Sequence, residues 1–192
     1  MTDNIIDEAL VTKADRFAEL AHGSEGQLRK YTGEPYIVHP REVAEIVRSV
    51  SGHTTEMICA ALLHDTVEDC TLVEIEVIHD LFGTKIAGLV DWLTDVSEPS
   101  DGNRAVRKQK DRAHLAQASA DAQTVKAADI ISNSGSIVEH DEKFAWVYLA
   151  EAEKTLDILV RADAELLARA RQTITDAQTD LVRRTLKQSY EH

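Results

Sequence analysis

The sequence predicts an all-α protein that forms one domain. Apolar residues recur three or four positions apart along most of the chain, as on one face of a helix, and no segment shows a convincing strand pattern. The 8 glycines and 3 prolines all lie before position 136, so almost nothing interrupts a helix in the C-terminal quarter. With 192 residues, 43% of them hydrophobic, the chain suffices for one well-buried core and is short for two. We therefore expect a single domain over residues 1–192.

Apolar spacing and helix-ending residues predict the first elements in order. A helix is expected over residues 5 to 22, and Gly23 is suited to its end. Pro40 suits the first position of the next helix, because a proline there loses no helical hydrogen bond. The apolar face of this second helix should pack against a third helix over about residues 54 to 65.

The later elements are predicted from caps, a loop and long amphipathic segments. Thr71-Leu-Val-Glu74 has the pattern of a capping box at the start of a fourth helix, which Gly83 closes. The segment 95 to 103 is rich in acidic and turn-forming residues and is the clearest loop. Helices are expected over residues 84 to 94, 104 to 119 and 121 to 133, before a turn at Asn133-Ser-Gly-Ser136 and two long amphipathic helices.

The charge and the cysteine content exclude several classes of protein. A formal net charge of −13 argues against a surface that binds nucleic acid, because such surfaces are normally basic. The first residues lack the basic and apolar regions of a signal peptide, and no run of about 18 apolar residues is present. Two cysteines do not suggest a disulfide framework. We expect a cytoplasmic protein without nucleic-acid or membrane partners, and the sequence leaves a homo-oligomer open.

The stretch Ala60-Ala-Leu-Leu-His-Asp-Thr-Val-Glu-Asp69 places four ionisable residues directly after an apolar run. On one continuous helix they would form a polar stripe beside the core: His64, Asp65, Glu68 and Asp69. Burying carboxylates beside an imidazole is costly unless positive charge compensates, and a divalent metal supplies that charge and can ionise a water. Alternatively, the first two residues cap a helix end and the acids are solvated. The stretch by itself leaves both interpretations open.

Two other places in the chain offer further ligands. His39 directly precedes the second predicted helix. Lys126, Asp129 and Asn133 are spaced i, i+3 and i+7, so they share one helical face. Taken singly, His39 fits an ordinary loop histidine, and Asp129 fits a solvated or capping acid. The order of His39, His64-Asp65 and Asp129 along one chain favours a shared metal site.

Three stretches of the chain resemble a known family. They are RKYTGEPYIVHPREVAEIV, AALLHDTVEDCTLVEIEVIHDLFGTKIAGLV and KAADIISN, and they are similar to the hydrolase domain of RelA/SpoT homologues within the HD superfamily of metal-dependent phosphohydrolases. The resemblance covers roughly residues 10 to 160, and the HDTVED element is specific to this branch. No synthetase domain fits in the remainder, so the chain most resembles the stand-alone small alarmone hydrolases. This implies a single HD-type helical bundle with long C-terminal helices.

The resemblance implies a role for each matching residue. Four residues match the metal ligands of the family, which usually hold manganese: His39, His64, Asp65 and Asp129. Glu68 and Asp69 match the acidic pair that orients the attacking water and transfers protons. Arg29 and Lys30 match a basic pair in the nucleotide pocket, and Asn133 matches a contact to the nucleoside.

The implied reaction is hydrolysis of the 3′-pyrophosphate of a small-molecule nucleotide, the alarmone (p)ppGpp or its adenine analogue (p)ppApp. The products would be pyrophosphate and a nucleoside di- or triphosphate. The chain departs from the family pattern near the fourth ligand, where Ile130 replaces a basic residue and Ser132 replaces an aromatic residue or histidine. Two alternatives therefore remain, an HD phosphatase acting on NADPH or a nucleoside monophosphate, and a non-catalytic nucleotide-binding domain. The complete set of acidic residues argues against a non-catalytic domain, because such a domain has no physical reason to maintain a costly acidic cluster.

The remaining basic residues each have two interpretations. One cluster follows the acidic loop and comprises Arg104, Arg107, Lys108, Lys110 and Arg112. This cluster could clamp the phosphates of a substrate or form a solvated helix face. Lys126, three residues before Asp129, could bind substrate phosphates or neutralise the acidic site.

Overall fold

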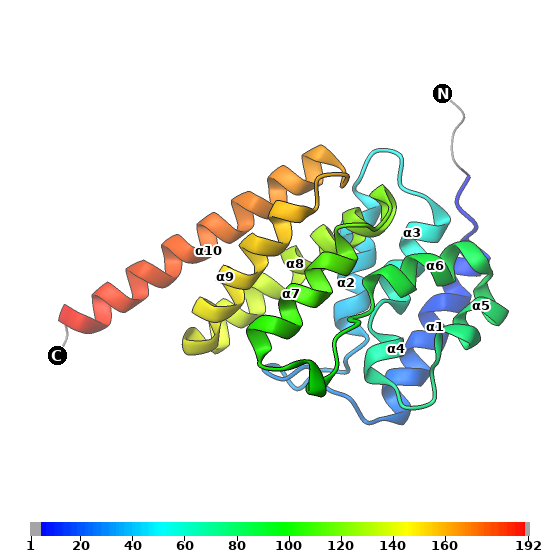
Figure 1. Cartoon of the computed structure of the whole chain (residues 1–192), viewed down its shortest axis with the longest axis horizontal. Helices are drawn as coiled ribbons and strands as arrows, with labels where there is room; N and C mark the ends of the chain where they lie inside the picture. Colours follow the sequence, from blue (N-terminus) through cyan, green and yellow to red (C-terminus); the bar gives the residue numbers. More distant parts are fainter. Residues whose placement is uncertain (1–4, 191–192) are drawn as a thin grey trace.

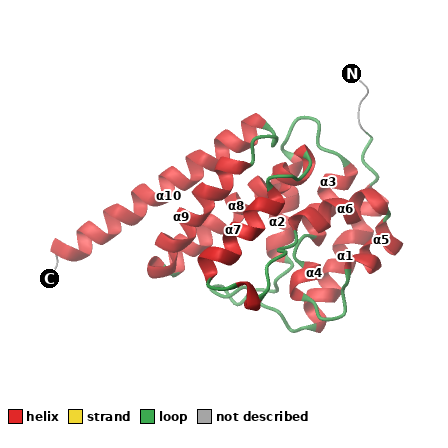
Figure 2. Cartoon of the chain, viewed as in Figure 1, coloured by secondary structure: helices red, strands yellow, loops and turns green. Residues whose placement is uncertain are grey.

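The computed structural model describes residues 5–190, and this part of the chain is built from helices without a β-strand (Figure 2). The helices are α1 (Glu8–Ser24), α2 (Val38–Arg48), α3 (Thr55–Leu63), α4 (Thr66–Asp69), α5 (Ile75–Phe82), α6 (Thr84–Leu93), a 3-10 helix η1 (Pro99–Asp101), α7 (Arg104–Leu115), α8 (Ala120–His140), α9 (Glu142–Ile158) and α10 (Ala164–Tyr190). The prediction of an all-α fold is confirmed. Within residues 5–190, none of the helices combines the length and the apolar composition that a membrane span requires.

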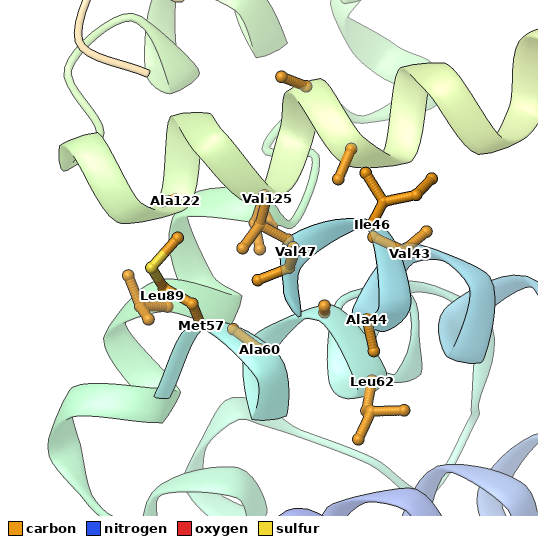
Figure 3. Packing of buried hydrophobic residues seen from close by; sticks show 14 of the residues in the cluster. Val43, Ala44, Ile46, Val47, Met57, Ala60, Leu62, Leu89, Ala122 and Val125 are labelled. Carbon is orange, nitrogen blue, oxygen red and sulfur yellow. The ribbon is translucent and has the colours of Figure 1, made fainter. Parts of the chain in front are cut away.

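Helix α3 forms the centre of the N-terminal half of the molecule. Every residue from Met57 to Leu63 is buried, so this short helix is apolar on all sides. It packs against α1, α2, α6 and α8, and the contact with α2 confirms the pairing predicted from the sequence. Figure 3 shows how Val47 of α2, Ala60 of α3 and Val125 of α8 contribute to the same core. The end of α3 is therefore fixed by packing from several directions.

The last three helices form a layer beside this core (Figure 1). Helix α10 runs along α8 and α9 and buries its apolar face through Leu166, Ala170, Ile174 and Leu181. Helix α8 also packs against α2, so it is held between the N-terminal core and α10. This placement brings the middle of α8 close to the start of α2 and the end of α3.

The chain bends between α3 and α4, so the polar stripe predicted on one continuous helix does not form. Helix α3 ends at Leu63, and α4 begins at Thr66. The Thr66 hydroxyl donates to the Leu63 carbonyl at 2.7 Å and so satisfies a carbonyl at the end of α3. His64 and Asp65 consequently lie at a junction between two helices, while the acids of α4 make separate contacts.

Further boundaries differ from the sequence prediction: α2 begins at Val38 and not at Pro40, and α7 ends at Leu115 and not at about residue 119. Glu74 is the N-cap of α5 without a side-chain cap, and the backbone N–H of Thr71 donates to Glu25, so the predicted capping box is wrong. The turn predicted at residues 133 to 136 is also wrong, because α8 continues through this segment. Packing against α2, α9 and α10 outweighs the weak helix preference of glycine and serine there.

We expect Leu63→Ala to lower the free energy of unfolding by about 2–5 kcal/mol, because the side chain is fully buried and its loss leaves a cavity. Urea unfolding followed by circular dichroism would measure the change. Leu72→Ala is the matched control, since this leucine is 85% exposed, and its effect should stay below about 0.5 kcal/mol. Equal effects of the two substitutions would contradict the assigned core.

Candidate functional site

Two histidines and two aspartates from separate parts of the chain meet at the end of α3. His39 lies in the first turn of α2, His64 and Asp65 at the α3–α4 junction, and Asp129 in the middle of α8. Nε2 of His39 lies 3.1 Å from Oδ1 of Asp129 and 3.7 Å from Oδ2 of Asp65. Nε2 of His64 lies 3.3 Å from Oδ1 of Asp65 and 3.7 Å from Oδ1 of Asp129. The structure thus brings together all four residues that the sequence suggests as metal ligands.

The His64 ring presents one nitrogen to this cluster without a hydrogen bond. The residue is 2% exposed, and its Nδ1 lies 2.8 Å from the carbonyl oxygen of Ala61. A carbonyl oxygen only accepts, so Nδ1 donates its proton there, and in the neutral ring Nε2 carries a lone pair. This Nε2 is buried and has no hydrogen-bond partner in the described part of the chain. An unpaired nitrogen aimed at carboxylates is typical of a metal ligand and unusual for a structural core histidine.

The His39 ring is oriented through Ser132 and Glu42. Nδ1 of His39 lies 2.9 Å from the Ser132 hydroxyl, which donates to Oε2 of Glu42 at 2.9 Å. Because the hydroxyl donates its only proton to the carboxylate, it accepts from Nδ1–H of His39. The opposite ring nitrogen then presents its lone pair to the cluster. Ser132, a departure from the family pattern in the sequence, is therefore part of the support of a candidate ligand.

Each candidate carboxylate ligand is also held by a second partner. The Tyr36 hydroxyl donates to Oδ2 of Asp65 at 2.6 Å. Lys126 Nζ lies 2.9 Å from Oδ2 of Asp129, and the Asn133 amide donates to Oδ1 of the same residue at 2.7 Å. Burial would raise the pKa of Asp129, but Lys126 and the two imidazoles hold it well below its usual range. Lys126 therefore pairs directly with a candidate ligand and keeps it anionic.

The separations among these atoms fit one divalent cation. His39, His64 and Asp65 offer ligand atoms that all lie within 4.8 Å of one another. A cation about 2.1 Å from each ligand would place neighbouring ligand atoms about 3.0–3.4 Å apart. The closest contacts in the cluster, 3.1 and 3.3 Å, match this spacing. Mixed imidazole and carboxylate ligands suit several divalent metals, so the donor set agrees with the geometry.

The charge balance of the cluster also calls for a cation. Burial would lower the pKa of His64, but the charges of Asp65 and Asp129 raise it to about 9. The two carboxylates therefore draw positive charge to the point where the ring nitrogens converge. A divalent cation at this point supplies that charge while leaving both imidazoles neutral.

The two acids of α4 point to different neighbours. Glu68 accepts a hydrogen bond from the backbone N–H of Asp95. Desolvation and the Asp95 carboxylate raise the pKa of Glu68 to about 7, which suits proton exchange near neutral pH. Asp69 accepts instead from Nε2 of Gln27 at 2.8 Å. Of these two acids, Glu68 shares a cleft with the candidate ligands Asp65 and Asp129.

The residues predicted to bind the nucleotide occupy two places. Nη1 of Arg29 donates to Oδ1 of Asn133 at 3.3 Å, and Asn133 in turn contacts Asp129. Lys30 is turned away to Asp141 in the α8–α9 turn, with Nζ 3.1 Å from the carboxylate and a side chain that is 70% exposed. Arg29 and Asn133 therefore come together beside the candidate ligands, and Lys30 does not join them.

A cleft extends from the cluster to helix α7. One part of about 230 Å³ is lined by Asp65, Asp129, Lys126 and Tyr148, among others. A neighbouring part of about 460 Å³ lies between α4 and α7. Four residues line both parts: Glu68, Asp95, Arg104 and Lys108. The two parts form one continuous surface with the candidate ligands at one end and basic side chains at the other.

The basic cluster on α7 is divided between this cleft and other contacts. Arg104, Arg107 and Lys108 line the larger part of the cleft, whereas Lys110 forms an ion pair elsewhere. Arg104 makes two hydrogen bonds to Glu151 of α9, at 2.7 and 2.8 Å. Lys108 Nζ lies 2.6 Å from Oδ2 of Asp95. Part of the cluster therefore faces the cleft, and acidic side chains hold two of its members there.

Sequence reasoning missed three residues that orient the candidate ligands and one that contacts Asp69: Tyr36, Glu42 and Ser132, and Gln27. Tyr36 lies in the quoted stretch GEPYIVHP, three positions before His39, and this proximity was the only signal available. In the sequence, Ser132 is a departure from the family pattern, and no role follows from that. The other two residues bond to partners far along the chain, which no local spacing reveals.

A sequence model described as the HD domain matches residues 14–135 of the chain. The chain is 36% identical over 159 residues to a protein of Brucella ovis named GTP pyrophosphokinase rsh, which covers 80% of this chain and 20% of that protein. It is 44% identical over 89 residues to a Synechocystis protein named probable guanosine-3′,5′-bis(diphosphate) 3′-pyrophosphohydrolase, over 46% of this chain and 11% of that one. The chain thus spans about a fifth or less of the length of these curated relatives.

One solved structure is similar over almost the whole chain. It is described as a metazoan orthologue of SpoT that hydrolyses ppGpp and plays a role in starvation responses. The two chains are 25% identical, with a TM-score of 0.76 over 88% of this chain and 95% of that one. The helical arrangement is therefore shared with that protein over most of both chains.

We expect Ser132→Ala to weaken the binding of a divalent cation by roughly 10–100-fold, because loss of the hydroxyl leaves the His39 ring without its orienting partner. Isothermal titration calorimetry with Mn²⁺ would measure the affinity. Ser100→Ala is the matched control, since it removes a similar serine–glutamate hydrogen bond on the surface, and its affinity should equal that of the unchanged chain. An unchanged affinity in Ser132→Ala would contradict the orienting role.

Proposed function

Because the chain belongs to the HD domain family, we propose that it is a metal-dependent phosphohydrolase that removes the 3′-pyrophosphate of (p)ppGpp or (p)ppApp. The observation that carries this proposal is the continuous cleft that joins the four candidate ligands, Glu68 and the basic residues of α7. The relatives whose names contain pyrophosphohydrolase or ppGpp hydrolysis support the same substrate class. We also propose that residues 1–192 act as one HD hydrolase domain.

We assign His39, His64, Asp65 and Asp129 as ligands of one divalent metal, with Mn²⁺ as the ion in use. The Nε2 of His64 supports this assignment most directly, because it is buried, has no hydrogen-bond partner within residues 5–190 and faces the carboxylates of Asp65 and Asp129. When bound, the metal supplies positive charge to the phosphoryl oxygens and promotes ionisation of a water. The protein fixes the ligands before substrate arrives.

The acidic residues of α4 are assigned to the water and its proton. Glu68 lies in the cleft with Asp65, and its pKa of about 7 lets it accept a proton and return it near neutral pH. Asp69 follows it on the same short helix and helps to orient the attacking water. In the proposed hydrolysis the water oxygen bonds to the phosphorus next to the 3′ oxygen, and the bond between this phosphorus and the 3′ oxygen breaks. Glu68 accepts a proton from the water and returns it to the 3′ oxygen, so pyrophosphate and a nucleotide with a 3′ hydroxyl are released.

The other cleft residues are assigned to the nucleotide. Arg104, Arg107 and Lys108 face the larger part of the cleft, where a substrate with several phosphates would bring negative charge. Arg29 and Asn133 meet beside Asp129 and are placed to contact the nucleoside. Lys30 lies apart from the cleft in this structure, so its predicted contact with the substrate requires a movement away from Asp141.

The test of this function is product analysis with Mn²⁺ and, separately, ppGpp, ppApp, NADPH and deoxynucleoside monophosphates. We expect pyrophosphate and a nucleoside diphosphate from one of the two alarmones, because the cleft combines a metal site with a polyphosphate-binding wall. Orthophosphate from another nucleotide, with both alarmones unchanged, would refute the proposed substrate and retain the metal site.

Two kinds of variant separate chemistry from metal binding in this assay. Glu68→Gln should keep Mn²⁺ and lower kcat by about 10²–10⁴-fold, because the amide cannot accept the proton. His64→Ala should lose metal and activity together, since it removes a candidate ligand. Wild-type turnover in both variants would show that the site assignment is wrong.

The ion pair between Arg104 and Glu151 predicts a change in substrate affinity. Substrate phosphates compete with the Glu151 carboxylate for the guanidinium, so Glu151→Gln should lower KM about fivefold with little change in kcat. Arg104→Gln should raise KM. Arg171→Gln removes a comparable exposed ion pair with Asp157 and serves as the control with unchanged kinetics. A higher KM in Glu151→Gln would contradict competition for Arg104.

A further inference from the structure

We propose that Gln27, oriented by the buried His22, is a positioning residue that holds the Asp69 carboxylate in its working orientation. The inference rests on the proposed function, which assigns Asp69 to the attacking water. His22 belongs to α1, Gln27 to the loop before α2, and Asp69 to α4. The three side chains form a chain of hydrogen bonds that links these elements.

Apart from Gln27, few contacts restrain the Asp69 side chain. It is the last residue of the four-residue helix α4, and the residue is exposed. Nε2 of Gln27 donates to its Oδ2 at 2.8 Å, which is the one hydrogen bond found at this carboxylate within residues 5–190. An exposed carboxylate on a short helix samples several rotamers unless a partner selects one. Gln27 is therefore the residue that selects the orientation of Asp69.

The orientation of the Gln27 amide follows from its two partners. An ionised carboxylate only accepts, so the NH₂ group of Gln27 must face Asp69 and its Oε1 must face the other way. Oε1 lies 2.7 Å from Nδ1 of His22, so this nitrogen carries the proton and donates it. His22 thereby favours one of the two amide orientations, and that orientation offers a donor to Asp69.

The setting of His22 is costly for a residue with a purely structural role. The side chain is 1% exposed, and its Nε2 is buried without a hydrogen-bond partner among residues 5–190. An apolar side chain of similar size would avoid this unpaired nitrogen. The Cys70 thiol also lies 3.5 Å from Nδ1, a normal length for a hydrogen bond that involves sulfur, so Nδ1 has two polar partners. The amide oxygen of Gln27 is the stronger acceptor of the two, and the contact to Gln27 is the one that links the imidazole to Asp69.

The same histidine also contacts the residue that holds a candidate metal ligand. The His22 and Tyr36 rings lie 4.7 Å apart, and the Tyr36 hydroxyl donates to Asp65. The backbone of Gln27 reinforces this arrangement, because its carbonyl accepts from the N–H of Tyr36 at 3.2 Å. The buried His22 ring therefore contacts two residues: Gln27, which bonds to Asp69, and Tyr36, which bonds to Asp65.

The first test is the kinetics of Gln27→Met, which keeps the length of the side chain and removes both hydrogen bonds. We expect kcat to fall roughly 10–100-fold, as for a misplaced catalytic group, with KM and Mn²⁺ affinity within about twofold of the unchanged chain. Gln172→Met is the matched control, because it removes an amide–carboxylate bond of the same 2.8 Å length to Asp176 on α10. Its kcat should not change.

A second test does not depend on activity. The long-range ¹H–¹⁵N spectrum of the histidine rings should show His22 as the tautomer with its proton on Nδ1, and this signal should shift in Gln27→Met. A proton on Nε2 in the unchanged chain would overturn the proposal even if the variant failed to fold. If the chain hydrolyses none of the nucleotides, that result by itself refutes only the proposed function. The spectrum still tests the hydrogen bond between His22 and Gln27 in that case.

Two kinetic outcomes would also overturn the proposal. An unchanged kcat in Gln27→Met would show that Asp69 needs no support from this residue. A loss of Mn²⁺ affinity in parallel with kcat would show that Gln27 acts through the metal ligands instead of through Asp69.

Discussion

The convergence of two imidazoles and two carboxylates at one buried point is the constraint on which the rest of the structure depends. His39, His64, Asp65 and Asp129 arrive from α2, the α3–α4 junction and α8, and their ligand atoms approach to 3.1–3.7 Å. The two carboxylates repel each other, and burial removes the solvation of all four groups. A cation among them compensates for both effects. The helices must therefore hold the ligands against this cost, which explains why α3 is buried on all sides and why α8 is held between α2 and α10.

Packing alone does not orient the ligands, and a surrounding set of polar residues does so. Ala61 and Ser132 each fix one imidazole, Tyr36 fixes one carboxylate, and Lys126 neutralises the other. These bonds leave ring nitrogens and carboxylate oxygens directed at a common point. The same principle extends to the acids of α4, whose partners are backbone or side-chain donors from other elements. These polar residues thus hold the candidate ligands and the acids of α4 in their orientations.

The cleft connects the four candidate ligands to helix α7, which is packed less firmly than the core. Helix α7 contributes only two buried residues and is joined to its surroundings by ion pairs such as Arg104 with Glu151. Ion pairs at a cleft surface are weak compared with the packing of the core, so an anionic ligand can compete for the basic partners. In the proposed reaction, precise placement matters at the phosphorus that is attacked, whereas the distant phosphates need only a positively charged surface.

Helical periodicity is a local property of the chain, so the helical fold could be predicted from the sequence. The four candidate ligands followed from the motif at His64-Asp65 together with the resemblance to the RelA/SpoT hydrolase domain, which also indicated the acidic pair. The sequence did not reveal that α3 ends at Leu63 and that a separate helix α4 begins at Thr66. The partners that orient these residues are set by the packing of the helices. Gln27 meets Asp69, and Ser132 meets His39, across 42 and 93 positions of the chain. Such contacts depend on how the helices pack, which no local spacing encodes.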